Sequence, residues 1–463
     1  MIQGEESSAR SPEEGASRPV EDVQQSPAIR LLAQRSARAD NKELRLKLPS
    51  HDDDDDDDDD DEDESQKNKL TSSSDSRLYY TSAQWTTDGT SLITTSSDQT
   101  VSSFVLPADL LQPAGEARTL QPQASIKLPE PTQVVAAAPY FSLAEPTSQL
   151  LLVGCRDHPL QVYHAFPKDA RSAPLTSYKL IKKESEQYIT PASLLWEYPG
   201  THFVCGSANR LDYFDMSQHG SGGPLLTVPT IPSRRHILKG GGVGMKGTVA
   251  ALAASPRDAN GGSVLAAGTW TRWMGLYDLH RTDRVIAHWS ISNAEAGFQV
   301  SLGGQGIVQT AWSPCGRYLV INERQAEGLL VYDIRGTGQL LSVLKGRRSN
   351  TQQRLHCDVF QGETGFEVWA GSQDGSVAVW EGVGSQNDVV EPSWTWKAHD
   401  SPIGSTIIHS SGSVVATCSG GWGHPSGGDD SADKTHDELC NGRVFDESSI
   451  KVWSIEGSTE PDS

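Results

Sequence analysis

The stretch IVQTAWSPCGRYLVINERQAEGLLVYDI, from Ile307 to Ile334, carries the pattern that decides the fold. It reads as an apolar strand, a turn with Pro and Gly, a second strand, a polar turn, and a third strand that closes on Tyr332. Six other segments repeat this order from Leu78 onward, and they close on Phe104, Tyr163, Phe214, Tyr277, Trp380 and Trp453. Successive closing aromatics lie 48 to 73 residues apart. The chain therefore consists mainly of seven similar units joined by loops of different length.

Seven units of this kind are typical of one all-β architecture. Each unit supplies three strands, and the apolar segment after it, such as QLLSVLK from Gln339, supplies a fourth. Seven four-stranded blades arranged in a ring leave only short, protected edges. The spacing exceeds the roughly 40–45 residues of a WD40 repeat, which indicates extended loops. An open double sheet or two β-sandwiches would not require seven equivalent units, so we predict a seven-bladed WD40 β-propeller over residues 78–455.

The acidic charge of the chain is concentrated near its N-terminal end. The sequence has 39 Lys and Arg against 60 Asp and Glu, a net charge of −21, and more than half of this excess lies in residues 1–76. An unbroken run of acids extends from Asp52 to Glu64. Mutual repulsion and the lack of apolar side chains oppose folding there. We expect residues 1–75 to form a disordered acidic tail.

Three further segments stand outside the regular repeats. Residues 42–48, KELRLKL, alternate leucine with charged residues and are our candidate for the strand that closes the seventh blade. Residues 420–448 interrupt the seventh repeat, are rich in Gly, Asp and Ser, and are expected to form a flexible insertion. Residues 456–463 are expected to be a disordered C-terminus.

Composition argues against several classes of protein. The longest apolar run, Val134–Phe141, has eight residues, whereas about 20 are needed to span a bilayer. The N-terminal residues are acidic and polar, unlike a secretory signal. The six cysteines are scattered singly, which fits neither a zinc site nor a disulfide framework. No GxSxG, HExxH or P-loop motif occurs, so we expect no membrane association, metal, cofactor, small-molecule substrate or enzymatic activity.

Basic residues concentrate in loops that we expect at one end of the ring. In a four-stranded blade, the turn between the second and third strands and the connection to the next blade emerge on the same end. The connections carry Lys182, Lys183, Arg234, Arg235, Lys239, Lys246, Lys345, Arg347, Arg348 and Arg354, and the turns carry Arg156, Arg210, Arg272 and Arg324. We call these residues the basic rim. They could attract RNA phosphates despite the negative net charge.

Two aromatic residues accompany the basic rim. Trp270 and Trp273 flank Arg272 and could stack on unpaired bases. Alternatively, the two indoles pack between blades, and the basic residues are ordinary solvated loop residues. The sequence leaves both interpretations open.

Several phrases resemble those of a known family. They are WTTDGTSLITTSSDQT in the first repeat, MKGTVAALAASP followed by LAAGTWTRWMGLYDL, QRLHCDVF from Gln353, and a seventh repeat split by an acidic insertion. In order and spacing they are similar to the telomerase Cajal body protein family of WD40 propellers, in a fungal-type form, over about 78–455. The resemblance implies binding of small Cajal body RNAs or telomerase RNA and their delivery to nuclear bodies.

The resemblance also leaves a second functional class open. More distant fungal relatives are linked to splicing ribonucleoproteins or described as negative regulators of G-protein signalling. Our first hypothesis is an RNA-binding adaptor for small nuclear RNA and ribonucleoprotein proteins, located in the nucleus, in foci like Cajal bodies, with some cytoplasmic protein. The alternative is a protein-only scaffold, on splicing particles or in G-protein signalling.

Overall fold

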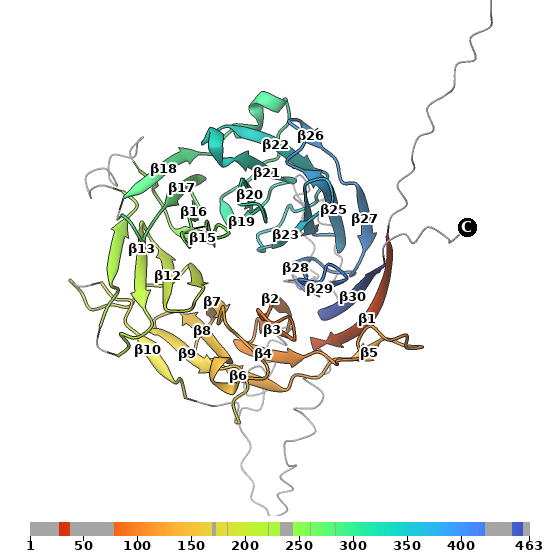
Figure 1. Ribbon diagram of the computed structural model, residues 1–463, viewed down its shortest axis with the longest axis horizontal. Coiled ribbons are helices and arrows are strands. Elements are labelled where there is room, and N and C mark those ends of the chain that lie inside the picture. The colour runs from red at the N-terminus through yellow and green to blue at the C-terminus, as the bar shows by residue number, and fades with distance from the viewer. Residues whose placement is uncertain are drawn as a thin grey trace, which may run out of the picture.

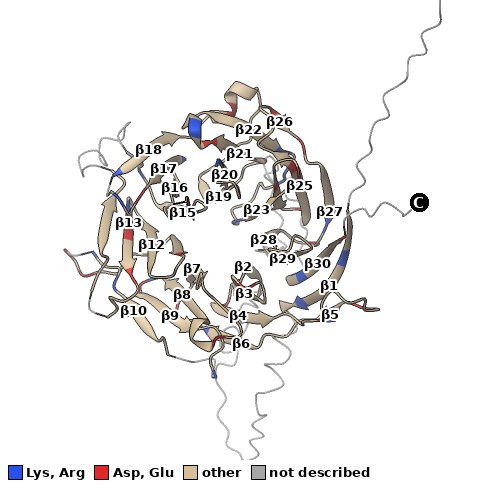
Figure 2. Ribbon diagram, in the orientation of Figure 1, with Lys and Arg blue, Asp and Glu red and all other residues tan. Residues whose placement is uncertain are grey.

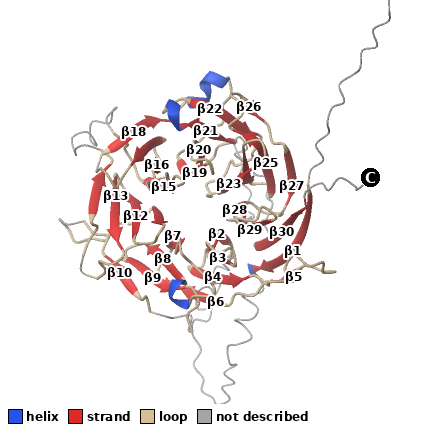
Figure 3. Ribbon diagram, in the orientation of Figure 1, coloured by secondary structure: helices blue, strands red, loops and turns tan. Residues whose placement is uncertain are grey.

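The computed structural model describes residues 27–37, 78–168, 173–182, 184–220, 222–231, 244–259, 261–282, 284–421 and 447–456. Their strands form seven antiparallel sheets arranged as the blades of a ring (Figure 1). Besides strands and loops, the described residues form three short 3₁₀ helices, Pro146–Ser148, Ala294–Phe298 and Ile334–Gly336 (Figure 3). None of their helices is long and apolar enough to cross a membrane. The predicted all-β, seven-bladed propeller is confirmed.

Blades 1 to 4 follow one another along the chain, each with its first strand innermost. Blade 1 contains β2 (Tyr80–Trp85), β3 (Ser91–Ser96), β4 (Thr100–Val105) and β6 (Ala124–Lys127). Blade 2 contains β7 (Thr132–Ala137), β8 (Leu150–Cys155), β9 (Leu160–His164) and β10 (Thr176–Tyr178). Blade 3 contains β11 (Ser193–Glu197), β12 (His202–Ser207), β13 (Arg210–Asp215) and β14 (Leu226–Pro229). Blade 4 contains β15 (Val249–Ala254), β16 (Leu265–Thr269), β17 (Trp273–Tyr277) and β18 (Val285–Ser290).

Two of the remaining blades carry an additional short strand. Blade 5 contains β19 (Ile307–Trp312), β20 (Tyr318–Glu323), β21 (Gly328–Asp333) and β22 (Leu340–Lys345), with β26 (Val389–Val390) added outside β22. Blade 6 contains β23 (Cys357–Gln361), β24 (Phe366–Gly371), β25 (Ser376–Val383) and β27 (Trp394–Lys397). Blade 7 contains β28 (Ile403–Ile408), β29 (Val414–Ser419), β30 (Ser449–Glu456) and β1 (Ala28–Ser36), with β5 (Arg118–Thr119) outside β1.

The ring closes through β1, a strand from the N-terminal segment. β1 pairs antiparallel with β30, from Ala28 opposite Glu456 to Ser36 opposite Ser449. Blade 7 therefore joins the two ends of the propeller. Residues 42–48, our candidate for this place, lie outside the described residues. The predicted disordered tail is corrected for Ala28–Ser36, where a bulge between Leu31 and Ala33 interrupts the alternation that would have marked a strand.

Packing between neighbouring blades explains the repeated residue types. The closing aromatics lie in the core, from Trp380, which is fully buried, to Trp453, which is 9% exposed. The second strands of several blades have glycine as their last or next-to-last residue, beside the first strand of the following blade. A Cβ at Gly268 would lie 2.6 Å from Ile307 Cγ2, and one at Gly371 would lie 2.5 Å from Ile403 Cβ. Only glycine allows the blades to approach this closely.

A polar network holds blade 7 together at the place where its repeat is interrupted. His399 Nδ1 lies 2.9 Å from Glu447 Oε1, and His399 Nε2 lies 2.7 Å from Thr417 Oγ1. Trp453 Nε1 donates to the same hydroxyl at 2.9 Å. These contacts join the connection from blade 6 to β29 and β30. Of the predicted insertion at 420–448, residues 422–446 lie outside the described residues, as do 457–463.

Ring closure can be tested at two adjacent positions of β1. Ala33 is fully buried and Gln34 is exposed. Ala33→Asp places a carboxylate without a partner in the core, so we expect the free energy of unfolding to fall by about 3 kcal/mol or more. Gln34→Asp should change it by less than about 0.5 kcal/mol. Urea denaturation measures both values, and equal stability of the two variants would contradict the role of β1.

Candidate nucleic-acid interface

The two kinds of loop expected at one end of the ring lie together there. The turn between the second and third strands of one blade hydrogen-bonds to an inter-blade connection. Asn209 N–H donates to Gly247 O at 3.0 Å, and Arg324 N–H donates to Gly306 O at 2.9 Å. Gln373 N–H likewise donates to the carbonyl of Arg348 at 2.7 Å. We call this end of the ring the rim face.

Members of the basic rim differ widely in exposure. Lys183, Arg234, Arg235 and Lys239 lie outside the described residues. The exposed members are Arg156, Lys182, Lys246, Lys345 and Arg348, the half-buried members are Arg210, Arg272, Arg324 and Arg354, and Arg347 is buried. Figure 2 shows acidic residues interspersed with the basic ones around the ring. The rim is therefore not uniformly available to an anion.

Arg347 is a structural residue and not a phosphate ligand. Only 1% of its surface is exposed, and its guanidinium donates to Gly371 O at 2.9 Å, Asn322 Oδ1 at 2.8 Å and Leu355 O at 2.6 Å. Burial lowers the pKa of this group to about 10. Because every acceptor lies inside the propeller, the guanidinium joins blades 5 and 6 and cannot reach a ligand. The sequence-based assignment of Arg347 is corrected.

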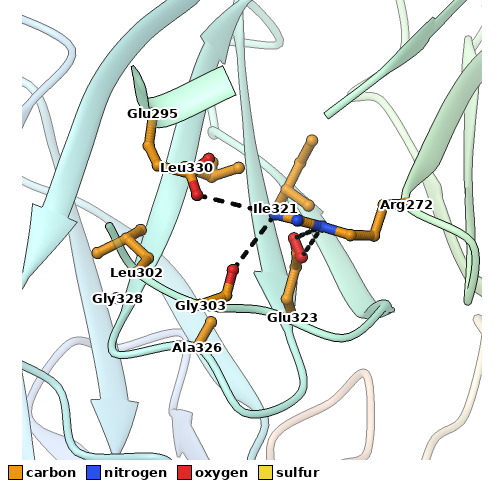
Figure 4. A pocket seen from close by; sticks show the side chains of 9 residues that line it. All are labelled: Arg272, Glu295, Leu302, Gly303, Ile321, Glu323, Ala326, Gly328 and Leu330. Carbon is orange, nitrogen blue, oxygen red and sulfur yellow. Dashed lines mark hydrogen bonds and ion pairs between the residues drawn. The ribbon is translucent and has the colours of Figure 1, made fainter. Parts of the chain in front are cut away.

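Arg272 is also engaged within the protein. Its Nε donates to both carboxylate oxygens of Glu323, at 2.7 and 2.9 Å, and its Nη2 lies 4.0 Å from Glu295 Oε1 (Figure 4). Burial raises the pKa of Glu323 to about 7, while the hydrogen bonds and charge of Arg272 act in the opposite direction. These three residues line a small pocket between blades 4 and 5 with Gly303 and Ile321. Here Arg272 neutralises buried acids, so its charge is not free for phosphate.

Four more rim residues have acidic neighbours. Arg156 lies 3.6 Å from Asp157 in an exposed pair. Arg210 forms a two-bonded ion pair with the fully buried Asp212. At the surface, Lys345 lies 3.4 Å from Glu391, and Arg348 lies 3.6 Å from Asp374. Exposed pairs of this kind are weak, typically below about 1 kcal/mol. Lys345 and Arg348 can therefore exchange a carboxylate for a phosphate. Arg210 cannot, because Asp212 would then be left as a buried charge without its partner.

Arg324, Arg354 and Trp270 form the part of the rim face best suited to nucleic acid. The Arg324 guanidinium carbon lies 5.5 Å from the ring centroid of Trp270, which is 41% exposed. Burial, and then the positive charge of Arg324, lowers the pKa of Arg354. Among the residues that the structure describes, neither guanidinium forms an ion pair, and Arg324 Nη1 donates only to Gln352 Oε1 at 3.3 Å. We call these three residues the arginine–tryptophan cluster.

The other tryptophan of the prediction has a packing role. Trp273 is half-buried, lies 5.9 Å from the His288 ring, and packs against the apolar cluster between blades 3 and 4. It therefore does not offer a face for stacking. Sequence reasoning missed Gln352, Glu295 and Glu323, because nothing in their local sequence shows which arginine they contact. Within the described part of the chain, no group of three His, Cys, Asp or Glu side chains is placed to hold a metal ion.

No family model matches this chain. The chain is 25% identical over 316 residues to guanine nucleotide-binding protein negative regulator 1 of Schizosaccharomyces pombe, a match that covers 68% of this chain and 72% of that protein. It is 24% identical over 388 residues to human telomerase Cajal body protein 1, covering 82% of this chain and 64% of that protein.

The resemblance to the telomerase Cajal body proteins is confirmed. The rat telomerase Cajal body protein 1 is 24% identical over 354 residues, covering 75% of this chain and 60% of the rat protein. The chain thus matches less than two thirds of the length of these two Cajal body relatives. The similarity extends over most of this chain.

The two adjacent arginines at 347 and 348 allow a direct test of the corrected assignment. Arg347→Met removes three buried hydrogen bonds, and of the three acceptors Leu355 O keeps a second donor, Asn322 Nδ2 at 2.7 Å. We expect the free energy of unfolding to fall by about 3 kcal/mol or more. Arg348→Met removes one exposed ion pair and should cost less than about 1 kcal/mol. Urea denaturation measures both. If Arg347→Met were as stable as Arg348→Met, Arg347 would not be a structural residue.

Glu323 predicts a pH dependence of stability. Its pKa in the folded protein is raised above that of an unfolded chain, so the folded state holds its proton more tightly and stability falls as the pH rises from about 4.5 towards 7. Glu323→Gln keeps the shape and removes this titration. We expect the decline in unfolding free energy between pH 5 and pH 8 to be smaller in Glu323→Gln than in the wild type. Identical pH profiles would show that Glu323 stays charged beside Arg272 throughout.

Proposed function

We propose that this protein is a non-enzymatic WD40 adaptor whose rim face binds single-stranded or loop RNA. The observation that carries the proposal is the arginine–tryptophan cluster, in which the Arg324 guanidinium lies over an exposed indole and the charge of Arg324 also acts on Arg354. Two nearby positive charges without an acidic partner favour a polyanion. An exposed indole offers a stacking surface for an unpaired base. Both features are expected of a site for unpaired RNA.

The remaining exposed basic residues extend the proposed RNA site around the rim face. Lys246 and Lys182 belong to inter-blade connections on this face, and both are exposed. Lys345 and Arg348 can exchange weak surface partners for phosphate. A strand of RNA that crosses these connections would meet several positive groups in succession. The net charge of −21 does not prevent RNA binding at the rim face. At physiological salt, the interaction between exposed charges is largely screened beyond about 8 Å, so distant acidic residues repel the RNA only weakly.

The class of RNA is proposed from similarity. Relatives named for telomerase and for the Cajal body match most of this chain. We therefore propose that the bound RNA is a small nuclear RNA, of the Cajal-body or telomerase type, and that the protein acts in the nucleus in localising or assembling ribonucleoproteins. Its protein partners would then be components of the same particles.

A protein-only scaffold is the second candidate function. It is favoured by one specific observation, the match to a fission-yeast protein named as a negative regulator of a guanine nucleotide-binding protein. A propeller in that role would use its surface for a protein partner and would not need a stacking indole. RNA binding distinguishes the two candidates.

The RNA hypothesis is tested by fluorescence anisotropy with a short labelled single-stranded RNA of mixed sequence. Lys246→Glu with Arg324→Glu should reduce affinity at least about tenfold and flatten the dependence on salt, because each lost phosphate contact removes roughly 0.7 from the slope of log K against log salt. Trp270→Ala should weaken binding by about 1–3 kcal/mol and leave that slope unchanged.

A matched control changes the same amount of charge at the other end of the ring. Lys168 and Arg284 are exposed and lie in connections between third and fourth strands. Lys168→Glu with Arg284→Glu should leave RNA affinity within about twofold of the wild type. If both double variants bind RNA equally, the rim face is not the RNA site. If the wild type binds no RNA, the scaffold function is favoured.

A further inference from the structure

Three blades have the same irregularity in their fourth strand. A bulge lies between Leu31 and Ala33 of β1, at Leu341 of β22, and at Ile286 of β18. These strands have nine, six and six residues, whereas the described outer strands of the other blades, β6, β10, β14 and β27, have three or four residues and pair without a bulge. β1, β22 and β18 therefore form a distinct group of long, bulged outer strands.

In two members of this group, the chain itself adds a parallel strand to the outer edge. β5 pairs with Ala33 and Gln34 of β1. β26 pairs with Val343 and Leu344 of β22, where Val343 N–H also donates to Asp388 O at 3.1 Å. Each added strand comes from a long connection of the following blade, residues 106–123 or 384–393. The paired residues lie one to three positions beyond the bulge, and both added strands lie on the outside of the ring (Figure 1).

The third member, β18, has no added strand among the residues that the structure describes. The connection that would have to supply it, 334–339 of blade 5, is short. It folds into the 3₁₀ helix Ile334–Gly336, whose Arg335 N–H is capped by Asp333 Oδ1 at 3.0 Å. It therefore cannot extend along β18. The edge of β18 remains exposed, and Ile286 at its bulge is 55% exposed.

The register of the blades shows where a strand would add to β18. In blade 5, Val343 lies two residues beyond the bulge of β22 and pairs with Leu330. In blade 4, His288 lies two residues beyond the bulge of β18 and pairs with Gly275. The corresponding residue of β1 is Gln34, which also pairs with its added strand. His288 thus corresponds to Gln34 and Val343, the residues at which β5 and β26 pair with β1 and β22. The N–H of His288 points away from β17, as the N–H of Val343 points away from β21. We propose that β18 binds a short extended segment of another protein as a parallel strand opposite His288 and Trp289.

The chemistry of that segment follows from β26 and from the charges beside β18. β26 lies in the sequence Asp388-Val389-Val390-Glu391, an apolar pair between two carboxylates, and Glu391 pairs with Lys345 at the end of β22. At β18, the exposed apolar residues Val285 and Ile286 follow the exposed Arg284. A carboxylate before the apolar pair of a parallel strand would approach Arg284. The partner segment is therefore an extended peptide with an apolar pair preceded by an acidic residue.

The probe for this site is a fluorescein-labelled peptide with the sequence of residues 385–393, SQNDVVEPS. Anisotropy with the full chain should show saturable binding. His288→Pro removes the outward N–H at the pairing position, so it should weaken binding at least about tenfold. Ser290→Pro removes another outward N–H beyond the paired residues and should bind within about twofold of the wild type. Binding that is absent from the wild type, or unchanged in His288→Pro, would overturn the proposal.

A second comparison leaves the protein unchanged, in case His288→Pro does not fold. In the parallel pairing of β22 with β26, the N–H of Val390 faces β22 and the N–H of Val389 faces away. A peptide N-methylated at the position of Val390 should therefore lose binding at least about tenfold. The peptide N-methylated at the position of Val389 should retain it. Equal binding of the two peptides would exclude strand addition.

Discussion

The pairing of β1 with β30 is the interaction on which the rest of the structure depends. A four-stranded blade cannot bury both of its faces alone, so each blade is stable only between two neighbours. Blade 7 is assembled from residues near both ends of the chain, and its pairing converts an open row of blades into a ring. In the closed ring every blade has two neighbours, and loops distant in sequence meet on one face. The rim face forms a complete ring only because this pairing is made.

The packing between blades determines which basic residues are buried in structural roles and which remain at the surface. Each inter-blade connection passes over the junction between two blades, where backbone carbonyls at the strand ends need donors. Arg347 donates to two backbone carbonyls and to the side chain of Asn322, and Arg272 pairs with a buried acid at a neighbouring junction. An arginine suits such a place because its fixed fork of N–H groups satisfies several acceptors at once. The same loops thus provide both structural arginines inside the ring and free ones, such as Arg324, at its surface.

The face and the edge of the propeller offer two different kinds of contact. The rim face combines positive charge with an exposed indole, which suits a flexible polyanion. The edge of β18 offers backbone hydrogen bonds and apolar side chains, which suit an extended polypeptide. Because blade 4 carries Trp270 at its rim and β18 at its outer edge, the two surfaces lie on the same blade and face different directions. An adaptor that joins RNA to protein needs two surfaces with this separation.

Much of the fold was determined by the sequence itself. Seven repeats with closing aromatics require seven equivalent units, and alternating apolar residues with turn signals specify the strands within them. Local patterns of this kind are short-range, so they can be recognised without knowing the fold. The closing strand was not recognised, because the bulge after Leu31 breaks the alternation and its partner β30 lies at the other end of the chain. Loop sequence likewise identified which arginines lie near the rim. Only the tertiary structure decided that Arg347 is buried and that Arg324 stacks beside Trp270, since burial and pairing depend on contacts between side chains of neighbouring repeats that no local pattern records.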